Sequence, residues 1–367
     1  MGIKDIRETT ESCKHCFMCR HACPTFLATK LDSHTPRGYA LLLSEIDHGL
    51  QSWTPSIIER FYQCSQCGLC REDCAYHWAE DEVVRNAREE IVAGNLAPER
   101  VRQTASSLLA GHSPGWTPSS AAFDKKGAEV LYFAGCSTRQ NHPEILQALD
   151  RILGAAGVDW TVMREEGCCG APLFEMGYTQ EAEEAWRLLL EKVGELRPKL
   201  LLTGCAHCYR MLSERSAHGQ AAGAPSLSIM HTSQYIQRRF SNGSLKPKKR
   251  AKLSKVSYHD PCQLGRKMRE FDAPRALIQT LTGSAPLELF HHREKAECCG
   301  SGSCLHLTDP QLVKRIAGRR LEGLREADSH VLITACQNCK TAFESAMPLE
   351  GFGLQVLDLA ELVIMVL

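Results

Sequence analysis

Short apolar runs alternate with amphipathic segments over the latter part of the chain. The runs begin near residues 129, 199, 255 and 329, and each ends just before a cysteine. Strands that alternate with helices are typical of a parallel sheet covered by helices. The pattern therefore predicts an α/β fold in this region. The predicted helices lie at residues 143–156, 181–196, 274–282 and 310–327.

This α/β region is an internal repeat. The apolar run that leads to Cys136 matches the run that leads to Cys262, and the run before Cys205 matches the run before Cys336. We therefore predict two pseudo-symmetric domains that pack face to face. The first copy spans residues 129–240 and the second spans residues 255–367.

The segments outside the repeat differ from it in composition. Helical patterns at residues 37–47 and 80–93, each followed by a glycine, predict a helical module over residues 1–97. Residues 98–128 are rich in Ser, Pro, Gly and Thr, which predicts a linker or a wrapping arm. Residues 241–254 are basic and predict a second linker, either solvated or docked on an acidic partner.

Composition excludes several classes of protein. The 367 residues are 43% apolar, as in ordinary globular proteins, and 43 basic side chains balance 43 acidic ones. This balance argues against binding to nucleic acid. The first ten residues are charged and do not form a signal peptide, and no run reaches the roughly 20 apolar residues that span a bilayer. We expect a cytoplasmic protein, with membrane association only through a partner subunit.

Nineteen cysteines carry the candidate chemistry, and they favour a reducing compartment in which thiols serve as metal ligands. Two runs near the N-terminus have the CxxCxxCxxxC spacing of two-cluster ferredoxins, in which the fourth cysteine binds the other cluster. Ala75 replaces the usual proline after the second run, which removes no ligand. One predicted [4Fe-4S] cubane takes Cys13, Cys16, Cys19 and Cys74. The other takes Cys64, Cys67, Cys70 and Cys23.

Each copy of the repeat carries five more cysteines in a C...CCG...CxxC frame. A soft set of five thiolates indicates iron-sulfur chemistry. The first copy has Cys136, Cys168, Cys169, Cys205 and Cys208. The second copy has Cys262, Cys298, Cys299, Cys336 and Cys339.

The doubled frame, with Tyr258-His-Asp-Pro-Cys262-Gln-Leu-Gly-Arg266, resembles the cysteine-rich CCG-domain proteins. This family includes the D subunit of heterodisulfide reductase and the iron-sulfur subunits of glycolate oxidase and of anaerobic glycerol-3-phosphate dehydrogenase. The resemblance covers nearly the whole chain and implies a helical ferredoxin-like module followed by two α/β CCG domains. It also implies that the five cysteines of each copy hold a noncubane [4Fe-4S] cluster. Some relatives keep only zinc or a degraded site in one copy, whereas this chain has lost no cysteine in either.

Three functions follow as hypotheses. The first is an electron-transfer subunit that links an FAD-containing dehydrogenase or other flavoprotein to a terminal acceptor such as quinone. A membrane haem subunit is a further partner where one is present. The second is a reductase that cleaves a disulfide at a CCG-bound cluster. The third is a zinc-stabilised scaffold. Neither Gly154-Ala-Ala-Gly157 nor Gly300-Ser-Gly302 is a nucleotide fingerprint, so we expect no flavin or NAD site on this chain.

Four further residues are candidates for chemistry beside the clusters. His207 and His259 are predicted to deliver protons to a departing thiolate, or else to hydrogen-bond to cluster sulfur or backbone. Arg266 is predicted either to bind a carboxylate or phosphate or to form an internal ion pair. Cys304, which lies outside every set, is either a thiol near substrate or a small, buried, inert side chain.

Overall fold

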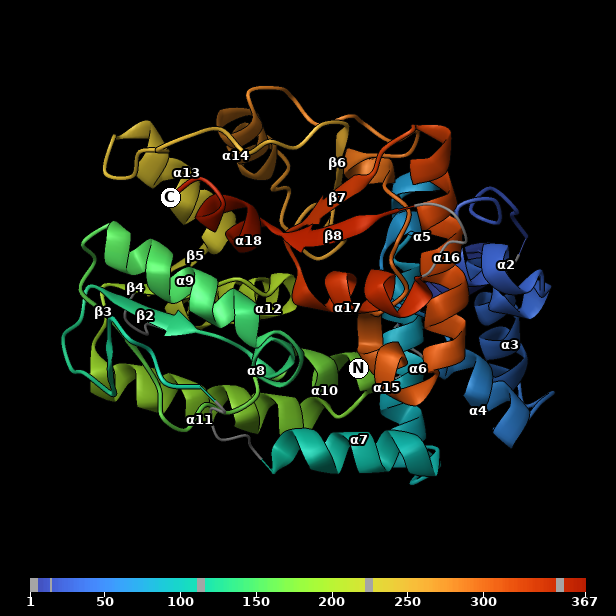
Figure 1. The fold of residues 1–367 in the computed structure, drawn as a ribbon. Helices are drawn as coiled ribbons and strands as arrows, with labels where there is room; N and C mark the ends of the chain where they lie inside the picture. Colours follow the sequence, from blue (N-terminus) through green and yellow to red (C-terminus); the bar gives the residue numbers. More distant parts are fainter. Residues whose placement is uncertain (1–5, 14, 111–115, 222–226, 348–352) are drawn as a thin grey trace.

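The computed structural model describes residues 6–13, 15–110, 116–221, 227–347 and 353–367. Its N-terminal part is helical (Figure 1). The helices are α1 (Arg7–Cys13), α2 (Pro24–Thr29), α3 (Pro36–Asp47), α4 (Pro55–Tyr62), α5 (Leu69–Asp73) and α6 (Glu80–Ala93), with a 3₁₀ turn η2 (Asp32–His34). The two helices predicted in this region are confirmed as α3 and α6. The Thr35 side chain accepts a hydrogen bond from the Gly38 amide, which caps α3.

The first half of residues 98–128, the segment predicted to be a linker or a wrapping arm, forms helix α7 (Glu99–Leu109), which the sequence analysis did not predict. Val101, Ala105 and Leu108 are buried along one face of this helix, which packs against α10 and α15. The Ser and Thr residues that suggested a linker occupy the other faces. The short strand β1 (Ala122–Phe123) then joins the first sheet.

The first copy contains a parallel sheet in the order β1-β3-β2-β4-β5. Its further strands are β2 (Val130–Phe133), β3 (Trp160–Val162), β4 (Leu200–Thr203) and β5 (Ser228–His231). Its helices are α8 (Cys136–Asn141), α9 (Pro143–Ala155), α10 (Ala171–Met176), α11 (Thr179–Leu196), α12 (Ala206–Ala221) and α13 (Thr232–Ser241). The central strands β3, β2 and β4 are almost wholly buried, as expected for a parallel sheet covered on both faces.

The second copy repeats this order with the parallel sheet β6-β7-β8. Its strands are β6 (Val256–His259), β7 (Val331–Thr334) and β8 (Gln355–Asp358). Its helices are α14 (Asp272–Thr282), α15 (Leu305–Thr308), α16 (Pro310–Glu326), α17 (Gln337–Ala346) and α18 (Leu359–Ile364), with 3₁₀ turns η3 (Arg293–Lys295) and η4 (Gly302–Cys304). In place of β3, a single parallel bridge joins Ser257 to Leu287.

The two copies pack through equivalent helices. An early helix of each copy meets the last helix of the other, because α9 packs against α18 and α14 packs against α13. This reciprocity is the mark of a two-fold relation between the copies. The helical module lies against the second copy, with α2 beside α16 at the right of Figure 1, and it also contacts the first copy through α6 and α10.

Candidate iron-sulfur centres

The cysteines of both repeats lie just beyond the carboxyl ends of strands. Cys205 follows β4 and Cys336 follows β7 by two residues each, and Cys136 and Cys262 follow the first strand of each copy by three. Because all strands in a sheet run parallel, these ends meet at one edge, where α/β proteins commonly place their ligands. The fold thus gathers thiols that are far apart in sequence.

The first thiol set of the helical module surrounds an open cavity of about 260 Å³. The set is Cys13, Cys16, Cys19 and Cys74. Met18, Tyr76 and Trp78 also line this cavity, and Tyr76 is 75% exposed. Burial, together with the Glu80 carboxylate, raises the pKa of Cys19 to about 12. The cavity brings together the four thiols that the spacing assigned to one cubane.

The second thiol set lies deeper and faces the second copy of the repeat. It lines another cavity and consists of Cys23, Cys64, Cys67 and Cys70. Burial raises the pKa of Cys64 to about 11, whereas a hydrogen bond with the Cys298 thiol lowers the pKa of Cys67 to about 6. Cys67 and Cys298 therefore lie near enough to influence each other's ionisation across the boundary between the helical module and the second copy.

The first CCG set borders a cavity of about 90 Å³. Its thiols there are Cys136, Cys169, Cys205 and Cys208, and Cys168 hydrogen-bonds to Cys169 from the core beside them. Burial raises the pKa of Cys136 to about 12. Cys304 lines the same cavity although it comes from the second copy, and burial holds the pKa of its thiol well above the ordinary value.

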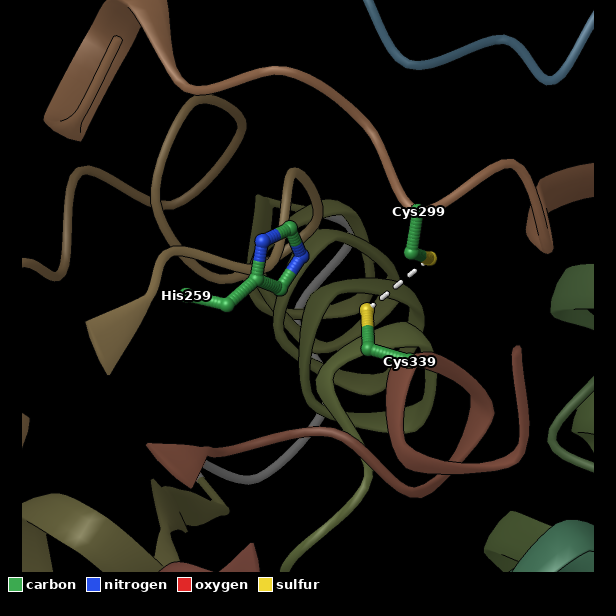
Figure 2. Close-up of side chains that lie close together, drawn as sticks. All are labelled: His259, Cys299 and Cys339. Carbon is green, nitrogen blue, oxygen red and sulfur yellow. Dashed lines mark hydrogen bonds between the residues drawn. The ribbon is translucent and has the colours of Figure 1, made fainter. Parts of the chain in front are cut away.

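The second CCG set is tighter, with the sulfur atoms of Cys299 and Cys339 3.1 Å apart (Figure 2). Cys298 hydrogen-bonds to both Cys262 and Cys299. Hydrogen bonds with Cys298 and Cys339, and the neighbouring His259 imidazole, lower the pKa of Cys299 well below its ordinary value.

The two CCG sets also lie beside each other. Cys336 of the second copy lowers the pKa of Cys205 of the first, and both thiols raise the pKa of the His207 imidazole between them. Together with the proximity of Cys67 and Cys298, this arrangement places three of the four thiol sets in a continuous line. The first set of the helical module lies beside the second, and Glu80 lines the cavities of both.

The donor chemistry of these sets fits iron and inorganic sulfide. All nineteen cysteines are described and are free thiols, and most of them are buried. Burial alone leaves such thiols protonated, whereas a bound metal cation displaces the proton and makes each sulfur a strong donor. Sets made of thiolates select iron-sulfur clusters or zinc over harder cations.

Glu175 is a buried carboxylate that sequence reasoning missed. Its Oε1 atom accepts hydrogen bonds from Arg210 (3.1 Å) and Gln263 (3.2 Å), and its Oε2 atom accepts one from the Ser303 amide (2.9 Å). The His207 Nε2 atom lies 3.8 Å from Oε2. Although burial opposes protonation, Glu175 and the neighbouring thiols raise the pKa of His207 well above its ordinary value. Glu175 thus holds a charged network at the meeting point of the two copies.

Two arginines tie the second thiol set of the helical module to the repeat. Arg88, fully buried, donates to the carbonyls of Cys64 (2.6 Å) and Glu175 (2.8 Å). Arg266 donates to the carbonyl of Cys67 (2.9 Å) and to that of Ala296. In this structure the Arg266 guanidinium contacts backbone carbonyls rather than an acidic side chain, and its exposed fraction is 4%.

Comparison with known proteins finds two family models that match three parts of the chain. The 4Fe-4S dicluster domain model matches residues 9–78, and the cysteine-rich domain model, CCG, matches residues 130–213 and 256–344. The D subunit of dihydromethanophenazine:CoB--CoM heterodisulfide reductase of Methanosarcina barkeri is 26% identical, over 96% of this chain and 93% of the relative.

Two other relatives belong to different oxidoreductases. The B subunit of fumarate reductase (CoM/CoB) of Methanothermobacter marburgensis is 22% identical over 98% of this chain and 73% of its own length. EtfAB:quinone oxidoreductase of Syntrophomonas wolfei is 23% identical over 93% of this chain and 55% of its own length. These relatives are all oxidoreductases or their subunits. Among the described residues, no helix combines the length and apolar character needed to cross a membrane.

Proposed function

We propose that this chain, which carries a 4Fe-4S dicluster domain followed by two cysteine-rich CCG domains, relays electrons between a flavoprotein partner and a terminal acceptor as the iron-sulfur subunit of an oxidoreductase complex. The line of four thiol sets is the observation that carries this proposal. The eighteen cysteines assigned to clusters from their spacing are the proposed ligands. Iron-sulfur clusters at these positions would supply one-electron steps between partners that exchange pairs.

The order of the four thiol sets supports a relay that has one end at the surface and the other end in the interior. The first set, around Cys13, is open to the surface beside Tyr76, so we assign it to contact with the redox partner. The second set leads through Cys67 and Cys298 to the second CCG set, and Cys336 and Cys205 lead on to the first. Most of the thiols along the inner part of this path are buried, which would limit the access of water to clusters bound there.

Anaerobic purification followed by metal and sulfide analysis tests the relay. We expect iron and acid-labile sulfide sufficient for four centres, and distinct EPR signals that appear in turn as the chain is reduced. Cys16→Ser, which alters the half-exposed ligand of the outermost set, should slow reduction by a flavoprotein partner and leave the signals of the CCG sets unchanged. A colourless protein that contains zinc and no sulfide would refute the relay and support the scaffold.

A second candidate function, disulfide reduction at a CCG set, is favoured by one observation. The cavity of about 90 Å³ beside the first CCG set is lined by His207 and Cys304 as well as by cluster thiols. His207 could protonate a departing thiolate there. Turnover of the isolated chain with a reduced dye and disulfides distinguishes the two functions, because a pure relay releases no thiol.

A further inference from the structure

We infer that His259 supplies a nitrogen ligand to the metal centre of the second CCG set, alongside the thiolates of Cys299 and Cys339. This inference rests on the proposal above that the second CCG set binds a metal centre. It gives His259 a role that the cysteine frame does not include, and it makes the two CCG sites chemically different.

The geometry brings one nitrogen and two sulfur donors to the same point. A ring nitrogen of His259 and the sulfur atoms of Cys299 and Cys339 all lie within 4.8 Å of one another. Figure 2 shows the imidazole beside the sulfur pair, with each side chain projecting from a different segment. His259 ends strand β6, Cys299 lies in the CCG loop, and Cys339 lies on α17. Such convergence from three segments is what a metal site requires.

The imidazole itself lacks the partners that a purely structural histidine would have. Its residue is 1% exposed, and neither Nδ1 nor Nε2 makes a hydrogen bond of ordinary geometry with the described residues. Buried polar groups are nearly always satisfied, and an unsatisfied one is costly. A bond from one nitrogen to a metal ion would remove much of that cost. The Phe343 ring packs against the imidazole at 4.8 Å and 83°, which fixes its plane.

The same surroundings argue against a proton-relay role for His259. A proton donor needs a chain of polar groups or water that leads to solvent. His259 is instead enclosed by the Phe343 ring and the thiols of Cys299 and Cys339. Imidazole and thiolate together form a ligand set that suits both iron and zinc.

The internal repeat allows His259 to be compared with the residue at the equivalent position of the first copy. His259 lies three residues before Cys262, and Phe133 lies three residues before Cys136 at the end of the matching strand. Phe133 is fully buried and has no donor atom. The first copy therefore holds its centre without a ligand from this position, and His259→Phe converts the second copy to the side chain of the first.

Pulsed EPR of the anaerobically purified full chain tests the nitrogen ligand. In protein labelled with ¹⁵N-histidine, the ¹⁴N couplings at the second CCG centre should give way to ¹⁵N couplings. This measurement needs no variant. His259→Phe should abolish those couplings, whereas His291→Phe, an exposed histidine on the same copy, should retain them. If the site holds zinc, X-ray absorption should find a nitrogen at about 2.0 to 2.1 Å beside sulfur at about 2.3 Å.

Two results would overturn the inference. One is a second CCG centre with no histidine coupling and only sulfur around the metal. The other is a coupling that persists in His259→Phe. Failure of the relay proposal would look different, because it would show as missing iron and acid-labile sulfide in the other three thiol sets. A second CCG set that binds no metal would also refute the inference.

Discussion

Glu175 joins segments that lie between 35 and 128 residues away from it in sequence. Its carboxylate is 1% exposed and accepts hydrogen bonds from Arg210, Gln263 and the Ser303 amide. We predict that Glu175→Ala lowers the free energy of unfolding by about 3 kcal/mol or more, because it leaves the buried Arg210 with only the half-exposed Glu214 carboxylate, 3.8 Å away, as a counter-charge. Thermal unfolding of the anaerobic protein measures this change. Iron content should fall at the first CCG set, which borders the same cavity.

The matched control for Glu175→Ala is Glu184→Ala. The Glu184 carboxylate pairs with Arg187 at 2.7 Å, and both side chains are more than half exposed. Solvent screens exposed pairs, so this variant should unfold at the temperature of the parent. Equal effects of the two substitutions would contradict the structural role assigned to Glu175.

Asp358 predicts a pH dependence of stability. Burial raises the pKa of this carboxyl to about 8, against an opposing hydrogen bond from the Ala360 amide. The folded state therefore holds a proton that the unfolded state releases near pH 4, and stability falls as pH rises from about 4 to about 8. The slope from this group is at most about 1.4 kcal/mol per pH unit. Asp358→Asn keeps a helix-capping side chain and should remove this part of the slope.

Unfolding midpoints of the parent and Asp358→Asn between pH 5 and pH 9 check this prediction. The parent should gain stability relative to the variant as pH is lowered. Parallel curves would show that Asp358 is ionised in the folded state. His231 caps α13 at the equivalent place in the first copy, and burial lowers the pKa of its imidazole to about 4, so His231→Asn should remove a slope of the opposite sign below about pH 6.5.

At the scale of residues, spacing predicted the grouping of cysteines and could not predict their neighbours. The structure places Cys74 in one cavity with Cys13, and Cys23 in another with Cys64, whereas the binding of a cubane by each set stays a prediction. Glu175 lies in an otherwise apolar segment, and its partners come from distant segments, so no local pattern identified it. The one indication in the sequence that Glu175 has a special role was that it is the single charged residue in that apolar segment.

At the scale of elements, Gly302 allows the second copy to approach the helical module. A Cβ atom at this position would lie 2.1 Å from the carbonyl oxygen of Ser65, which belongs to the loop of the second thiol set. We predict that Gly302→Ala destabilises the protein by about 1 to 3 kcal/mol, because the backbone of that loop must move. Melting temperature and iron retained per chain measure the effect.

Gly318→Ala is the control for this substitution. Gly318 lies within α16, and an added Cβ would meet nothing within 4 Å. Alanine is a better helix former than glycine by about 1 kcal/mol, so this variant should be as stable as the parent or more stable. Loss of iron in Gly318→Ala and not in Gly302→Ala would contradict the close approach.

Element prediction succeeded where local period and end signals agreed. Thr35 and Pro36 mark the start of α3, and Gly94 follows the end of α6, so both helices were predicted from the sequence. Helix α7 was missed because Ser and Thr outweighed the buried positions Val101 and Ala105. The reduction of the third strand in the second copy to a bridge at Leu287 is a tertiary effect with no local sequence signal.

At the scale of the whole molecule, two sets of contacts bring the thiol sets of the proposed relay together. The two-fold packing of α9 on α18 and α13 on α14 brings the CCG sets together, and docking of the helical module adds the remaining two sets. The internal repeat predicted the first arrangement. The second could not be read from the sequence, because it depends on ion pairs and backbone contacts between distant segments.

The ion pair between Lys267 and Asp81 is the most buried of the charge pairs that join the helical module to the second copy. The two side chains are 16% and 6% exposed, and Asp81 also pairs with Arg71 at 3.1 Å. We predict that Lys267→Met lowers stability by about 3 kcal/mol, since Asp81 stays buried with one partner fewer. It should also slow electron transfer from the module to the CCG sets, because Cys67 and Cys298 move apart.

Rapid-mixing reduction, followed by EPR of each centre, measures that transfer. The control is Arg269→Ala, which removes a pair with Glu72 in which the arginine is 60% exposed. An exposed pair contributes at most about 1 kcal/mol, so this variant should transfer electrons at the parental rate. If Lys267→Met unfolds more easily and still reduces its CCG centres at the parental rate, the docked interface stabilises the protein without being the electron path. Electrons would then have to reach the CCG sets by a route other than the one through Cys67.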